Sequence, residues 1–211
     1  MAETIRVFFD EGGFTSYLIA FAGLVLLIMG TWRLYYLYFK IRPGTSQLLT
    51  QLQMLIQGRK YMEAIQICNE VKNVPQIHVI KSGLLAVDSG REAMKSALGS
   101  SVVEVVKDCE KGIPIISLIA SVATLLGLLG TISGLIKTFT AIATADPAKK
   151  SEMLGLGISE AMIATAAGLI VGIAAMVVYT LCSSKTDEHI SQAKKAGYDL
   201  IATIERSERE A

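Results

Sequence analysis

A single carboxylate interrupts a long apolar segment in the last third of the chain. Between Met153 and Ser184 the only charged residue is Glu160. If Gly157 is the N-cap of a helix, Glu160 lies at the third helical position, where a carboxylate interacts favourably with the helix dipole. Alternatively, Glu160 is an ionisable group at the mouth of a polar pathway, a role in which carboxylates within membranes are often found.

Hydroxyl groups form the second set of polar candidates. Alternating steps of three and four residues place nine small residues on one line: Ser117, Ala120, Thr124, Gly127, Thr131, Gly134, Thr138, Ala141 and Ala145. A second line holds Ala161, Thr165, Gly168, Gly172 and Ala175. Such lines are typical of closely packed helices in lipid, where small residues let backbones approach. The threonines could instead face a wet cavity or a polar group of another chain.

Counting residues from the flanking lysines predicts the depths of these groups. Thr131 follows Lys111 by 20 residues, and Thr165 precedes Lys185 by 20 residues. At about 1.5 Å per residue both lie about 30 Å from the same boundary, so an antiparallel pair of helices brings them to one level. Glu160 lies about 37 Å from Lys185, at or just beyond the outer edge of a hydrocarbon core of about 30 Å.

Other kinds of chemistry find little support. The net charge is +1 and no basic stripe contains interleaved aromatic residues, which argues against nucleic-acid binding. Three dispersed cysteines and two isolated histidines give no metal-site spacing, and the cysteines are expected to be reduced. The glycine-rich stretches lack the spacing of phosphate or dinucleotide loops. We therefore expect no metal, no cofactor and no enzymatic activity.

Three apolar segments are expected to position the polar groups. They cover residues 17–39, 113–145 and 161–184, each long enough to cross a bilayer, and they are interrupted only by Arg33 and Lys137 near helix ends. With 52% hydrophobic and 18% charged residues, the chain is too apolar for an ordinary soluble domain. We predict an all-α integral membrane protein with three transmembrane helices and long helical cytosolic extensions.

The distribution of Lys and Arg predicts the orientation. Residues 40–112 contain ten of them and residues 185–211 contain five, whereas residues 1–16 and 146–160 contain few. The positive-inside rule places the two basic segments in the cytosol. Residues 1–16 are then a periplasmic N-terminus, 40–112 a helical cytosolic insert, 146–160 a periplasmic loop with the start of the third helix, and 185–211 a cytosolic helix.

Two motifs in the apolar segments resemble a known family. "TLLGLLGTISGLIKTF" and "LGLGISEAMIATAAGLIVGI" look like the two signature helices of the ExbB/TolQ/MotA proton-channel family, and the similarity extends loosely to the cytosolic insert. Three spans match the ExbB and TolQ branches rather than four-span MotA. Many ExbB and TolQ chains have proline where Thr124 stands and tryptophan where Ser133 stands, so the branch stays open.

The resemblance implies a function and partners. It implies a subunit of an inner-membrane motor driven by the proton motive force, coupling proton flow to work on the outer envelope. Five such chains would surround single-span ExbD/TolR-type helices that carry a membrane aspartate, with a TonB/TolA-type energy-transducing protein as a further partner. The ion pathway would include Thr131, Glu160 and Thr165. Positions facing the pore or partner would be Thr124, Gly127, Gly134, Thr138 and Gly168.

One alternative from the residues alone stays open. A non-conducting membrane scaffold would also pack its helices through small-residue seams. Such a scaffold requires neither Glu160 nor threonines at one level.

Overall fold

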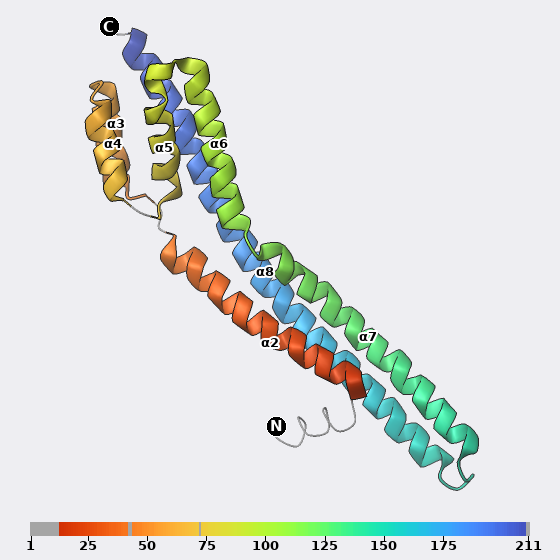
Figure 1. Ribbon diagram of the computed structural model, residues 1–211. Helices are drawn as coiled ribbons and strands as arrows, with labels where there is room; N and C mark the ends of the chain where they lie inside the picture. Colours follow the sequence, from red (N-terminus) through yellow and green to blue (C-terminus); the bar gives the residue numbers. More distant parts are fainter. Residues whose placement is uncertain (1–12, 42–43, 72, 210–211) are drawn as a thin grey trace. The chain divides into compact units, whose positions relative to one another are not determined.

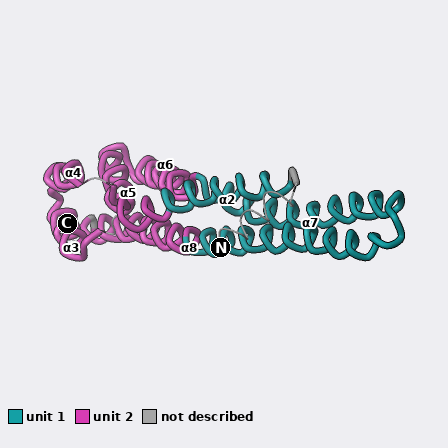
Figure 2. The backbone as a smooth tube through the Cα atoms, turned by 90° about the horizontal axis from the view of Figure 1, so that it is seen from below, with its two compact units in different colours: residues 1–33, 112–181 teal, residues 34–111, 182–211 magenta. Residues whose placement is uncertain are grey.

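The computed structural model describes residues 13–41, 44–71 and 73–209 (Figure 1). Throughout these residues the secondary structure is helical and contains no strand, which confirms the predicted all-α class. The chain forms two compact units, residues 1–33 with 112–181 and residues 34–111 with 182–211 (Figure 2). Most of the expected periplasmic N-terminus, together with Arg42 and Lys72 of the basic insert, lies outside the described residues.

The first unit is built from three long helices. It contains most of α2 (Gly13–Tyr35), all of α7 (Ile113–Thr144) and the first half of α8 (Lys150–Arg209). Each of the three is part of a helical stretch long and apolar enough to cross a membrane, as the composition predicted. Lys137 is exposed, whereas Arg33 is only 2% exposed and is covered by the packing of the protein.

Contacts at glycines define the order of these helices. A Cβ atom on Gly23 would lie 3.5 Å from Val171, and one on Gly30 would lie 3.1 Å from Val178, so α2 runs parallel to α8. Gly127 lies against Gly168 and Gly134 lies against Ala161, so α7 and α8 run antiparallel. The two helices lie side by side over their length in this unit (Figure 1). Because lipid gives apolar side chains no drive to associate, these close backbone approaches must supply the packing energy.

The start of α7 is marked by a break in the helical backbone. The last helix of the insert, α6, ends at Glu110 and α7 begins at Ile113. Gly112 between them has a φ of 82°, a left-handed conformation that glycine adopts without the strain of a Cβ atom. Pro114 lies in the first turn of α7, where its missing N–H costs no hydrogen bond.

The second unit is a small helical bundle. It contains the π-helical turn Tyr36–Lys40, α3 (Ser46–Gln57), α4 (Tyr61–Glu70), α5 (Pro75–Leu85), the 3₁₀ turn Val87–Ser89, α6 (Arg91–Glu110) and the end of α8. The predicted helical character of the insert is confirmed. Its core holds Leu52, Ile56, Ile77, Val79, Leu84, Met94, Leu98, Leu200 and Ile204. The fold places the C-terminal part of α8 in the same core as the insert.

Polar contacts link distant parts of this bundle. The Thr186 hydroxyl donates to the carbonyl of Cys109 at 3.0 Å, and Arg91 pairs with Glu205. The imidazole of His189 is 1% exposed, and its Nε2 lies 3.2 Å from the carbonyl oxygen of Leu37 in the π-helical turn. Burial lowers the pKa of His189, partly offset by this hydrogen bond. The neutral imidazole is thus favoured within the bundle.

Candidate functional site

Small residues bring α7 and α8 into backbone contact. A Cβ atom on Gly127 would lie 3.2 Å from the Cα atoms of Thr165 and Gly168, and one on Gly168 would lie 2.7 Å from the Ala123 carbonyl oxygen. Gly134 approaches Ala161 just as closely, since a Cβ atom on this glycine would lie 3.1 Å from the alanine Cβ. These glycines therefore have a packing role within one chain, in addition to any role toward a partner.

One hydrogen bond crosses the contact between the two helices. The hydroxyl of Thr165 donates to the backbone carbonyl of Gly127 at 2.9 Å. The glycine at position 127 lets the two backbones come close enough for this short side chain to reach across. Such bonds between membrane helices contribute about 0.6 kcal/mol on average and up to about 1.7 kcal/mol. Thr165 therefore sets the register of the pair as well as adding a polar group to it.

Thr131 lies at the same level as Thr165. Gly130 faces Ala164 and Gly134 faces Ala161, so the intervening Thr131 lies within one to two residues, about 3 Å or less, of the level of Thr165. This agrees with the level predicted by counting from Lys111 and Lys185. Thr131 is half-buried, and its hydroxyl donates to the carbonyl of Leu128 at 2.7 Å. The oxygen of that hydroxyl keeps lone pairs that can accept a hydrogen bond from water or a protonated carboxyl group.

The other two threonines of the line differ in exposure. Thr124 is exposed and donates to the carbonyl of Ala120 at 3.0 Å. Thr138 is buried, donates to the carbonyl of Gly134 at 2.8 Å, and lies directly against Gly157 of α8. Both threonines therefore lie on the side of α7 that meets α8, Thr124 against Gly172 and Thr138 against Gly157, but only Thr138 is buried.

Glu160 lies well inside α8. The helix begins at Lys150, so Gly157 is not an N-cap and the expected position of Glu160 in a first helical turn is wrong. Ten residues, about 15 Å, separate Glu160 from the start of the helix. The side chain is half-buried, beside Ala161 which contacts Gly134 of α7, and it makes no hydrogen bond or ion pair with any residue that the structure describes. Among the described residues, no cation therefore balances the charge of this half-buried carboxylate.

The N-terminal end of α2 adds hydroxyls that the sequence did not single out. Thr15 is 9% exposed, and its Oγ1 would lie 3.3 Å from a Cβ atom on Gly130. Ser16 is fully buried, and its hydroxyl has no hydrogen-bond partner within the described segments. Both precede residue 17, where the apolar segment was expected to begin. The helix starts at Gly13, which brings the two hydroxyls to the level of Thr131 and Thr165.

Metal chemistry has no counterpart in this arrangement. Across residues 13–41, 44–71 and 73–209 there is no group of three His, Cys, Asp or Glu side chains that could hold a metal ion. The three cysteines, Cys68, Cys109 and Cys182, are buried and form no disulfide with one another. The polar groups along the contact between α7 and α8 include the hydroxyls of Thr138 and Thr165 and backbone carbonyls, with the carboxylate of Glu160 beside Ala161. Hydroxyls and carbonyls orient water and protons, and the carboxylate can change its charge.

Comparisons with known proteins agree with this geometry. A putative biopolymer transport protein, an ExbB homolog of Methanothermobacter thermautotrophicus, is 28% identical over 190 residues, covering 90% of this chain and 66% of that relative. The putative biopolymer transport protein ExbB-like 1 of Helicobacter pylori is 24% identical over 185 residues, covering 88% of this chain and 90% of that relative. This chain thus spans just under two thirds of the length of the first relative.

The fold is also that of a solved structure. The structure of C. jejuni MotAB aligns with 91% of this chain and 78% of that chain, with a TM-score of 0.66 and 14% sequence identity. The model of the MotA/TolQ/ExbB proton channel family matches residues 71–195, which include α7, most of α8 and much of the helical insert. Because that match covers more than half of the sequence, the chain belongs to the MotA/TolQ/ExbB proton channel family.

Proposed function

We propose that this protein is an ExbB/TolQ-like subunit of an inner-membrane motor driven by the proton motive force. Five copies surround single-span helices of the ExbD/TolR type, and a TonB/TolA-type protein transmits the work to the outer envelope. The observation that carries the proposal is the arrangement of Thr131, Thr165 and Glu160 along the contact between α7 and α8. Two hydroxyls at one level lie about one and a half turns from an unpaired carboxylate.

The chain itself supplies no charge-changing group in the middle of a span. Thr131 and Thr165 can orient water and accept hydrogen bonds, but a threonine hydroxyl does not ionise near neutral pH. Glu160 lies toward the outer end of α8, beyond both threonines. A proton crossing the bilayer needs an ionisable group or a water chain nearer the centre, and a buried carboxylate is the usual carrier. We therefore assign that carrier to a membrane aspartate of the partner helix.

A second function has its own supporting observation. The glycines of α7 and α8 are in contact within a single chain, as a scaffold that conducts nothing would also require. Such a scaffold does not need Glu160, since no described residue pairs with it. Replacement of Glu160 therefore separates the two functions.

The test is proton flux in liposomes under a pH gradient, followed with an internal pH-sensitive dye. The full chain alone should leak few protons, and co-reconstitution with its single-span partner should open a path that is lost when the partner's membrane aspartate becomes asparagine. Glu160→Gln should abolish most of the partner-dependent flux while the complex still forms. The control Glu152→Gln changes an exposed carboxylate near the start of the same helix and should leave the flux intact.

Two results would contradict the proposal. Equal flux in the wild type and Glu160→Gln would favour the scaffold. Strong flux through this chain without any partner would show that the charge-changing group lies in this chain.

A further inference from the structure

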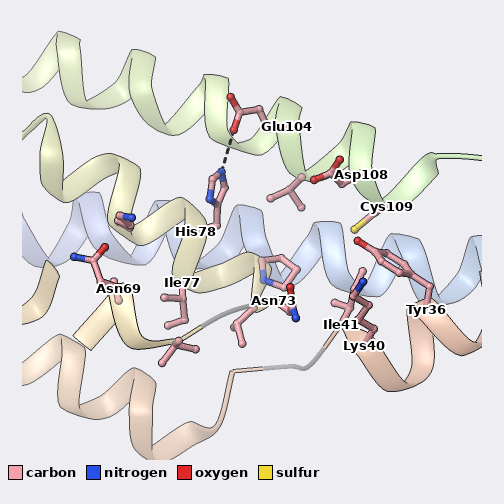
Figure 3. A pocket seen from close by; sticks show the side chains of 16 residues that line it. Tyr36, Lys40, Ile41, Asn69, Asn73, Ile77, His78, Glu104, Asp108 and Cys109 are labelled. Atoms are coloured by element: carbon pink, nitrogen blue, oxygen red, sulfur yellow. Dashed lines mark hydrogen bonds and ion pairs between the residues drawn. The ribbon is translucent and has the colours of Figure 1, made fainter. Parts of the chain in front are cut away.

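The second unit contains a cavity that the proposed proton path does not use. Its volume is about 510 Å³, within the range of about 300–1,000 Å³ typical of small-molecule sites. The π-helical turn, α4, α5 and α6 all contribute to its lining (Figure 3). Every lining residue belongs to the second unit. The cavity is therefore a feature of the helical bundle, separate from the contact between α7 and α8.

Residues at the end of the first apolar segment line part of the cavity. Tyr36, Lys40 and Ile41 line it, and they directly follow the apolar residues of α2 along the chain. Trp32, Tyr35 and Tyr38 are 55%, 62% and 48% exposed, as aromatic residues at a membrane–water interface are. Tyr36 instead faces the cavity, with the Lys40 ammonium 5.4 Å from its ring centre. Along the chain, Tyr36, Lys40 and Ile41 therefore adjoin the predicted end of the first span, where lipid headgroups are expected.

The lining carries charges of both signs. Lys40 and Lys81 supply two ammonium groups, whereas Glu104 and Asp108 of α6 supply two carboxylates on the opposite side from Lys40 (Figure 3). His78 lies 3.0 Å from Glu104 and is part of the same wall. The charge of Lys81 acts on the thiol of Cys68, another lining residue whose pKa burial raises to about 11. The positive charge of Lys81 therefore acts electrostatically on a residue that lines the cavity.

We propose that this cavity binds the zwitterionic headgroup of a phosphatidylethanolamine-type phospholipid. Lys40 and Lys81 bind the phosphate, and Glu104 and Asp108 accept hydrogen bonds from the primary ammonium. Charge-assisted hydrogen bonds of this kind are about twice as strong as neutral ones. A purely anionic headgroup would face two carboxylates, and a quaternary choline ammonium has no N–H to donate. The cavity therefore discriminates by headgroup chemistry and not by net charge alone.

The experiment uses the full-length protein in phosphatidylcholine nanodiscs. Native mass spectrometry would measure retention of added short-chain phosphatidylethanolamine, with phosphatidylglycerol of the same chain length for comparison. We expect phosphatidylethanolamine to bind at least about tenfold more tightly than phosphatidylglycerol, since one charge-assisted bond corresponds to about that factor. Free phosphoethanolamine should compete, but more weakly than the lipid. Inorganic phosphate should not compete.

Three variants sharpen the test. Lys81→Ala should lower retention of phosphatidylethanolamine about tenfold. Lys107→Ala is the matched control, because this exposed lysine lies on the helix that carries Glu104 and Asp108 but does not line the cavity. It should bind as the wild type does. Asp108→Asn should narrow the preference for phosphatidylethanolamine over phosphatidylglycerol, because it removes repulsion of the anion. Circular dichroism would confirm that each variant is folded.

Three outcomes would overturn the proposal. Equal losses in Lys81→Ala and Lys107→Ala would mean that lysines act only through general surface charge. Equal affinity for phosphatidylethanolamine and phosphatidylglycerol would remove the role of the carboxylates. Phosphoethanolamine binding as tightly as the lipid would identify a soluble ligand in place of a membrane one.

Discussion

Replacing Gly168 with alanine tests the contact between α7 and α8 most directly. The added Cβ atom would lie 2.7 Å from the Ala123 carbonyl oxygen, 2.7 Å from the Gly127 Cα and 2.9 Å from the Gly127 nitrogen. All three are backbone atoms, so no side-chain rotation relieves the clash and the helices must move apart. Overpacking of this kind costs about 1–3 kcal/mol. Separation of the helices also lengthens the Thr165–Gly127 hydrogen bond, now 2.9 Å.

A matched control lies on the same helix. A Cβ atom on Gly155 meets nothing within 4 Å, so Gly155→Ala is the same chemical change without a clash. Alanine is favoured over glycine in a helix interior by about 0.5–1 kcal/mol, which should make this variant as stable as the wild type or slightly more stable. The structure therefore predicts effects of opposite sign for two identical substitutions in α8.

The assay is equilibrium unfolding in mild detergent, with helicity monitored by circular dichroism. The free energies of unfolding of the two variants should differ by at least about 1.5 kcal/mol, with Gly168→Ala the less stable. Proton flux with the partner should also fall in Gly168→Ala. If the two variants unfold together, the close approach of α7 and α8 at Gly168 does not stabilise this protein.

Three further predictions concern other parts of the molecule. Thr165→Val keeps the side-chain volume but removes the hydrogen bond to Gly127, so it should destabilise the protein by about 0.6–1.7 kcal/mol and reduce proton flux. In the control Thr180→Val, the hydroxyl that is removed bonds only to Met176 of the same helix, so stability and flux should not change. Equal effects of the two substitutions would contradict the special role of Thr165. Because burial lowers the pKa of His189 from its usual value near 6.5, the unfolded chain binds more protons than the folded one below about pH 6.5, so stability should fall as the pH decreases from about 7.5 to 5.5. Melting temperatures of His189→Gln should depend less on pH than those of the control His78→Gln, which changes an exposed imidazole, and parallel curves would refute this origin. Native mass spectrometry in mild detergent should detect a pentamer, whereas a stable monomer would contradict the assembly proposed above.

Local sequence patterns were sufficient for the three spans and for the level of the threonines. An apolar run of about 20 residues has few alternatives to a membrane helix, because lipid cannot hydrogen-bond an unfolded backbone. A helix also rises by a constant amount per residue, so counting from Lys111 and Lys185 predicted that Thr131 and Thr165 share a level. The two family motifs were also recognisable from local sequence, since each lies within one continuous helix.

The start of the third helix was beyond such patterns. Residues 146–160 were expected to hold a loop and the start of the third helix, with Gly157 as a possible N-cap, yet α8 begins at Lys150. Packing explains the difference, because Gly157 lies against Thr138 and so the helix is supported by α7 beyond the apolar run. Tertiary contact outweighs the low helix propensity of glycine here. The correction moves Glu160 away from a helix terminus and leaves its carboxylate without a structural explanation.

The sequence by itself determined which residues share a helical face, and the tertiary structure decided what each face meets. Periodicity identified the line from Ser117 to Ala145 but treated its members alike. Only the packed helices show that Thr124, Gly127 and Thr138 all contact α8, and that Thr138 is buried there while Thr124 remains exposed. The buried hydroxyls of α2 and the charged cavity of the second unit also depend on contacts between segments far apart in the chain. Such contacts are set by three-dimensional packing, on which the spacing within one helix carries no information.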